Sequence, residues 1–194
     1  MTAKDAYELE YWKSTDPIKH LRKYEMYLER WKFWHSHRKV IEIGTGPYSG
    51  FLPFVTAEHK VGVDPLYDAY KQAGIFLRYP GIQYRCSGLE DVKPSTGLQG
   101  FDALLCADCL DHGDLDFRMI PKLSALLIWG GKIYLHVHLR PKNKLNMAHD
   151  HAMLESDLDE ALAKTTLKEV RREILPTDID GKFCPALMAV WSKE

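Results

Sequence analysis

Apolar side chains in the first part of the chain recur at helical spacing. Residues 4–13 place three aromatic positions on one side of a helix: Tyr7, Tyr11 and Trp12. A second helix is expected to begin at Asp16-Pro17, because Asp caps free backbone amides and proline fits the first helical position. The apolar positions that follow are 3, 4 and 3 residues apart: Leu21, Tyr24, Leu28 and Trp31. This pattern predicts an amphipathic helix that ends near His37.

From residue 39 the pattern changes to short β-branched or apolar runs that alternate with helical stretches. Strands are expected at residues 40–43, 60–64, 82–86, 102–106 and 132–139. Such alternation predicts a parallel sheet with right-handed crossovers. Two further strand-like runs, 168–174 and 186–191, are joined by a turn-rich stretch that leaves no room for a helix. We therefore expect an α/β fold that ends in an antiparallel pair.

The first strand runs into a glycine-rich turn, which we expect to lead into a helix. Gly44 and Gly46 would let the backbone turn tightly and approach a ligand closely. Asp64 ends the next strand, 18 residues after Gly46, where a carboxylate can accept hydrogen bonds from both hydroxyls of a ribose. The two features together predict a nucleoside site at the carboxyl edge of the sheet.

The turn differs from that of a dinucleotide site. The motif G-x-G-x-x-G would place its third glycine where this chain has Ser49, and the glycine falls one residue later, at Gly50. Glu42 would repel a pyrophosphate but would suit a cationic ligand. S-adenosylmethionine carries an ammonium and a sulfonium and no phosphate, so it is the favoured nucleoside.

With these motifs, residues 40–192 resemble the class I S-adenosylmethionine-dependent methyltransferases. Segments 42–46 and 61–64 are similar to the first two family motifs. Residues 101–106 are similar to the strand under the transferred methyl group, and residues 110–112 to the loop that follows it. Gly130-Gly131 is similar to the glycine pair before the fifth strand. The chain departs from the family at Trp129, where proline is usual, and in the displaced Gly50.

The resemblance implies a Rossmann-like, seven-stranded, mostly parallel sheet with a C-terminal antiparallel strand. Residues 1–38 would form an N-terminal helical extension or lid, and residues 39–194 the methyltransferase domain, with S-adenosylmethionine as cofactor. The residues expected to bind it are Glu42, Gly44, Thr45, Gly46, Asp64, Leu89, Glu90 and Asp108.

Candidates for catalysis follow the fourth and fifth strands. Methyl transfer requires an aligned acceptor and the removal of one proton. His112 can take that proton, with Asp111 or Asp114 tuning its pKa. Alternatively, Asp111 or Asp114 caps the next helix and His112 contacts the cofactor. His138 on the fifth strand is the other catalytic candidate.

A second group of candidates surrounds His138. His136 and Arg140 share its strand face, and His149 and His151 follow in a long loop that suggests a lid. We expect this group to bind the acceptor and assign it no metal, although paired histidines also suit a metal or simple packing. Trp12 is expected to be a lid over the cofactor site and is grouped with the residues that contact the acceptor, although aromatic side chains at this spacing also suit core packing.

Composition and charge limit the classes of partner that the protein is expected to bind. The chain has 194 residues, about one domain, and its 26 basic and 27 acidic side chains give no electrostatic case for nucleic acid or membrane. The four cysteines lack zinc spacing, and no apolar run approaches about 20 residues. We expect a cytoplasmic enzyme with inert thiols that methylates oxygen or nitrogen of a small molecule. The alternatives are an NAD-linked oxidoreductase or epimerase and a non-catalytic cofactor-binding module.

Overall fold

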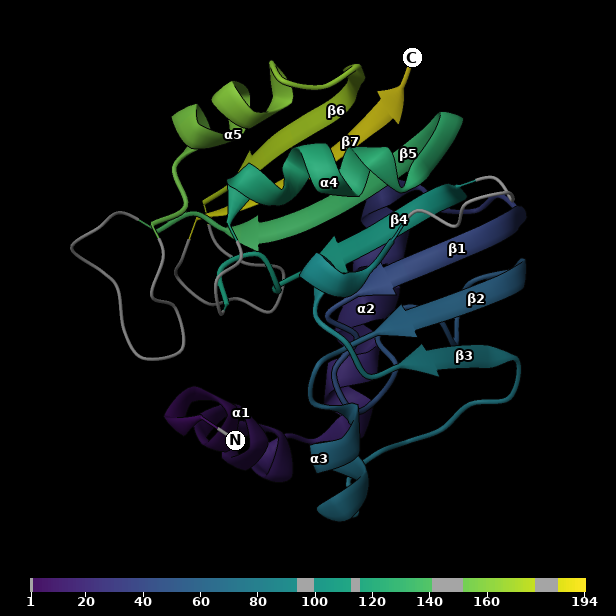
Figure 1. The fold of residues 1–194 in the computed structure, drawn as a ribbon, viewed down its shortest axis with the longest axis vertical. Helices are drawn as coiled ribbons and strands as arrows, with labels where there is room; N and C mark the ends of the chain where they lie inside the picture. The colour runs from purple at the N-terminus through teal and green to yellow at the C-terminus, as the bar shows by residue number, and fades with distance from the viewer. Residues whose placement is uncertain (1, 94–99, 113–115, 141–151, 177–184) are drawn as a thin grey trace. The chain divides into compact units, whose positions relative to one another are not determined.

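The computed structural model describes residues 2–93, 100–112, 116–140, 152–176 and 185–194 (Figure 1). It is an α/β fold whose seven strands follow the order β3-β2-β1-β4-β5-β7-β6. The strand β7 runs antiparallel to its neighbours, so the expected mostly parallel sheet with a C-terminal antiparallel strand is confirmed. The chain forms two compact units, Met1–Lys93 and Pro94–Glu194.

The described residues of the first unit form three parallel strands, three α-helices and a 3₁₀ helix. Its elements are α1 (Ala3–Ser14), α2 (Pro17–Trp31), β1 (His37–Ile43), β2 (Ala57–Val63), α3 (Tyr67–Gln72), β3 (Ile82–Arg85) and the short 3₁₀ helix η1 (Leu89–Asp91). Asp16 caps α2 as expected, because its carboxylate accepts from the amides of Ile18 and Lys19. The helix ends at Trp31, earlier than the predicted His37, because Lys32 adopts a left-handed conformation that stops it.

Aromatic side chains of α2 form much of the core of the first unit. The ring of Phe51 lies 4.4 Å from that of Tyr24, 6.2 Å from that of Tyr27 and 5.2 Å from that of Trp31, between ring centroids. All four side chains are buried, and burying such a side chain contributes roughly 1.5–3 kcal/mol. This packing anchors the segment that follows β1.

The described residues of the second unit form four strands, two α-helices and a 3₁₀ helix. They are β4 (Phe101–Ala107), η2 (Phe117–Met119), α4 (Ile120–Ala125), β5 (Leu127–His138), α5 (Glu155–Leu162), β6 (Leu167–Leu175) and β7 (Ala186–Lys193). The strands β4 and β5 pair in parallel, and β7 pairs antiparallel with both β5 and β6. The antiparallel pair predicted at the end of the chain is therefore confirmed. The helix α4 packs against β5 and α5 (Figure 1).

Two local predictions are wrong. The helix expected after the glycine turn is a series of turns over residues 47–54. Gly130-Gly131, expected before the fifth strand, lies within β5, which begins at Leu127 opposite Phe101. None of the helices among the described residues is long and apolar enough to span a membrane.

Candidate functional site

The turn after β1 is held by the carboxylate that ends β2. The amide of Gly46 donates to Asp64 Oδ2 at 2.9 Å, and the amide of Leu66 donates to Asp64 Oδ1 at 2.8 Å. Gly44 and Gly46 have φ of 72° and 61°, which glycine adopts without strain. Burial raises the pKa of Asp64 to about 6, although the two amides oppose that shift. Asp64 therefore joins the two loops predicted to bind a nucleoside.

The carboxyl group of Glu42 holds the segment that follows this turn. Its Oε2 accepts from the amides of Phe51 at 2.9 Å and Leu52 at 3.2 Å. Its Oε1 lies only 1.8 Å from where a Cβ on Gly50 would stand. The displaced glycine is therefore explained by the buried acid, a relation that motif comparison missed. In this structure Glu42 is a positioning residue of the loop.

Burial also makes the Glu42 carboxyl group sensitive to pH. It raises the pKa of Glu42 well above the usual value of 4.5, so the folded chain holds a proton that the unfolded chain releases. The difference between the folded and unfolded pKa of Glu42 adds to the free energy of unfolding. This contribution is fully present below pH 4.5 and is lost as pH rises through the raised pKa. Glu42→Gln keeps an acceptor oxygen but cannot ionise.

We therefore expect the free energy of unfolding of Glu42→Gln to fall less steeply than that of the wild type as pH rises above 4.5. Urea unfolding at several pH values measures this slope. Glu58→Gln, at an exposed position of β2, is the matched control and should follow the wild type. Parallel slopes for Glu42→Gln and the wild type would contradict the prediction.

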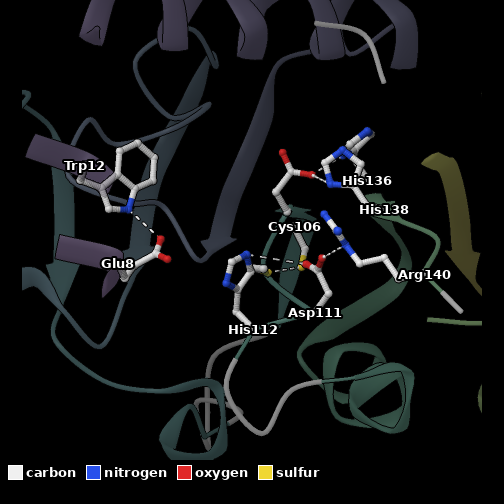
Figure 2. A network of polar contacts seen from close by, with 10 residues as sticks. Glu8, Trp12, Cys106, Asp111, His112, His136, His138 and Arg140 are labelled. Carbon is white, nitrogen blue, oxygen red and sulfur yellow. Dashed lines mark hydrogen bonds and ion pairs between the residues drawn. The ribbon is translucent and has the colours of Figure 1, made fainter. Parts of the chain in front are cut away.

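The N-terminal helix contributes an indole to the same turn. Trp12 is buried, and its Nε1 donates to Glu8 Oε1 at 2.8 Å (Figure 2). A Cβ on Gly46 would meet the Trp12 ring at 2.8 Å, so the indole lies directly against the turn. Trp12, predicted as a lid over the cofactor site, therefore lies against the turn predicted to bind the nucleoside.

The other predicted cofactor contacts in the first unit have different surroundings. The Thr45 hydroxyl hydrogen-bonds that of Tyr67, a fully buried residue that sequence motifs did not single out. Leu89, the first residue of η1, is buried. Glu90 is exposed, with its carboxylate close against Gly88. Of these three, only Thr45 lies in the glycine turn itself.

In the second unit, Asp108 meets two histidines at the carboxyl ends of β4 and β5. Asp108 Oδ1 lies 2.7 Å from Nδ1 of His136 and 3.6 Å from Nδ1 of His138. The two imidazoles lie side by side, with centroids 5.4 Å apart and an interplanar angle of 83° (Figure 2). Both are buried, and Asp108 has a left-handed φ of 52°. The sequence placed Asp108 among the cofactor contacts and did not connect it with the histidines.

A second carboxylate, Asp111, lies between a histidine and an arginine (Figure 2). Its wholly buried side chain has Oδ2 3.5 Å from Arg140 Nε and Oδ1 3.8 Å from His112 Nε2. The side chain of His112 is 26% exposed, so its ring is accessible to solvent. Asp111 therefore contacts His112, as the catalytic hypothesis requires, and also Arg140.

Two thiols that were expected to be inert and two histidines that were expected to contact the acceptor complete the set of residues singled out in the sequence. The Sγ atoms of Cys106 and Cys109 are 2.6 Å apart, and the pKa of Cys109 is raised by its contact with Cys106 and by burial. A thiol with a raised pKa is a poor nucleophile near neutral pH. His149 and His151 lie outside the described residues, as does Asp114.

Comparison with known proteins identifies the fold. No family model matches the sequence, and no curated protein matches it significantly. A chain of the Haloferax volcanii complex between the Trm112 methyltransferase activator and a methyltransferase has a TM-score of 0.73 and 11% identity, covering 100% of this chain and 98% of that one. The N-methyltransferase NodS from Bradyrhizobium japonicum, in complex with S-adenosylhomocysteine, has a TM-score of 0.64 and 15% identity, with 98% of each chain covered.

A third similar structure is the Burkholderia thailandensis 1,6-didemethyltoxoflavin-N1-methyltransferase, solved with that compound and S-adenosylhomocysteine. Its TM-score is 0.63 at 16% identity, covering 95% of this chain and 81% of that one. The resemblance to class I methyltransferases is thus confirmed at the level of the fold. At these identities the similarity establishes the fold alone.

Proposed function

We propose that the protein transfers a methyl group from S-adenosylmethionine to oxygen or nitrogen of a small molecule. The observation that carries this proposal is the buried Asp64 carboxylate bonded to the glycine turn, in a chain with a methyltransferase fold. The negative charge of Glu8 further raises the pKa of Asp64, so two acidic groups lie near this turn. Such surroundings oppose a pyrophosphate and favour a ligand that carries sulfonium and ammonium groups.

The residues of the first unit would bind the cofactor. Asp64 would accept hydrogen bonds from the ribose hydroxyls, while Gly44 and Gly46 would allow the backbone to approach the ligand. Glu42 would act through the loop that it holds. When bound, S-adenosylmethionine supplies an electrophilic methyl group, so the protein needs only to align an acceptor and remove its proton.

The second unit would handle the acceptor. His112 is proposed to accept its proton, because the ring is partly exposed and the Asp111 carboxylate would stabilise the imidazolium that forms. His138, beside Asp108, is the second candidate base. Arg140 and His136 would contact the acceptor. His149 and His151, which lie outside the described residues, are proposed to do so as well.

The test uses the full chain and S-adenosylmethionine with a labelled methyl group. Label should move to a compound in pools of hydroxylated or aminated small molecules, and transfer should fall by roughly 100-fold in His112→Gln, a typical loss for a general base. The matched control is His35→Gln at an exposed position of the first unit, which should transfer normally. Binding of NAD in place of S-adenosylmethionine would contradict the proposal, and cofactor binding without transfer to any pool would favour a non-catalytic module.

A further inference from the structure

We infer that Asp108, His136 and His138 form a binding site for a divalent transition-metal ion. One donor atom from each of the three side chains lies within 4.8 Å of the others. The histidines alternate along β5 and so face the same side, while Asp108 directly follows β4. The amide of Asp108 donates to the carbonyl of His136 at 3.0 Å, so the backbone holds the two strand ends in this register.

The side chains need little movement to bind an ion. Both Nδ1 atoms already lie near one oxygen of Asp108, at 2.7 Å for His136 and 3.6 Å for His138. With ligand bonds of about 2.1 Å, the donors of a tetrahedral site lie about 3.4 Å apart. A small rotation of the carboxylate would therefore replace direct contact with shared coordination.

Among the described residues, the three side chains of the cluster differ in their exposure to solvent. The side chain of His136 is fully buried and that of His138 is 8% exposed, whereas that of Asp108 is 23% exposed. The imidazoles are therefore held rigidly by packing, and solvent reaches the cluster beside the carboxylate. An ion can enter on that side, and a ligand can bind it there.

The chemical nature of the three donor atoms determines which ions the cluster would bind. Two imidazole nitrogens and one carboxylate oxygen suit Zn²⁺, Fe²⁺ or Co²⁺, whereas Mg²⁺ and Ca²⁺ prefer oxygen ligands throughout. Three protein ligands leave at least one coordination position open, which is typical of catalytic metal sites and not of structural ones. That position would take water or an oxygen of a bound molecule.

The inference deepens the proposed function and, as far as it concerns the acceptor, rests on it. An ion here would select an acceptor that carries a hydroxyl or carboxylate oxygen, because such groups bind a Lewis acid readily. His138 would then be a metal ligand, and His112 would be the base that accepts the proton. The ion site itself can be tested without cofactor or acceptor.

The experiment titrates the chelator-treated full chain with Co²⁺ and then with Zn²⁺. We expect one equivalent of Co²⁺ to bind with visible absorption, Zn²⁺ to displace it, and Zn²⁺ to raise the thermal unfolding midpoint. Asp108→Asn and His138→Gln should each weaken Co²⁺ binding by about 100-fold or more, since losing even an outer partner of a metal ligand costs 10–100-fold. The exposed His59→Gln on β2 is the matched control and should bind normally.

Three results would overturn the inference. They are no Co²⁺ absorption, equal binding by wild type and Asp108→Asn, or a sulfur charge-transfer band that disappears in Cys109→Ser. The thermal midpoint without metal shows whether each variant still folds; His136 is left unchanged because it is fully buried. Co²⁺ binding without S-adenosylhomocysteine binding would refute the proposed function alone, and the reverse result would refute the metal site alone.

Discussion

Gly50→Ala is expected to lower the free energy of unfolding by roughly 3 kcal/mol, because two separate costs add. The first cost is conformational, since φ at Gly50 is 50°, a region that disfavours alanine. The second is steric: the new Cβ would stand 1.8 Å from Oε1 of the buried Glu42 carboxyl group. That group cannot move away without leaving the amides of Phe51 and Leu52.

Urea unfolding followed by circular dichroism measures this loss. Gly74→Ala separates the two costs, because Gly74 has φ of 71° but no atom within 4 Å of the added Cβ. It should lose only about 1 kcal/mol, the conformational part. Equal losses in the two variants would show that Glu42 does not restrict position 50.

Asp64→Ala is expected to weaken the binding of S-adenosylhomocysteine by about 100-fold, or about 2.7 kcal/mol. A carboxylate that accepts from both ribose hydroxyls makes two charge-assisted hydrogen bonds, and each contributes roughly 1.5–3 kcal/mol. The substitution also removes the acceptor for the amides of Gly46 and Leu66, so the turn after β1 would no longer be held in its present conformation. Titration calorimetry measures the affinity.

The same carboxylate predicts how this affinity depends on pH. Burial raises the pKa of Asp64 to about 6, so ionised Asp64 destabilises the folded chain as pH rises from 3.8 through about 6. Ribose hydroxyls bind the ionised form, and affinity should therefore fall as pH drops below about 6. Asp68→Ala, which removes an exposed carboxylate of α3, is the matched control. Unchanged affinity in Asp64→Ala, or affinity independent of pH, would contradict the ribose role.

Local patterns in the sequence predicted most of the fold. The spacing of hydrophobic residues predicted the order of strands and helices, and the Asp-Pro pair predicted the cap at Asp16. The short stretch between the last two apolar runs predicted the final antiparallel pair. The errors lie where an element depends on a partner far away in the chain. Leu127 extends β5 because it pairs with Phe101, and the segment after Gly46 forms turns that Glu42 and the α2 aromatics hold.

The sequence by itself determined which chemical groups stand at the strand ends: glycines and Asp64 in one unit, and histidines on one face of β5 in the other. Those properties depend on spacing within a strand or turn, which the order of residues specifies. Only the tertiary structure decided that Glu42 holds the loop at Gly50 and that Asp108 joins His136 and His138. These contacts join residues 8 to 30 positions apart, so they exist only once packing and strand register have brought the groups together.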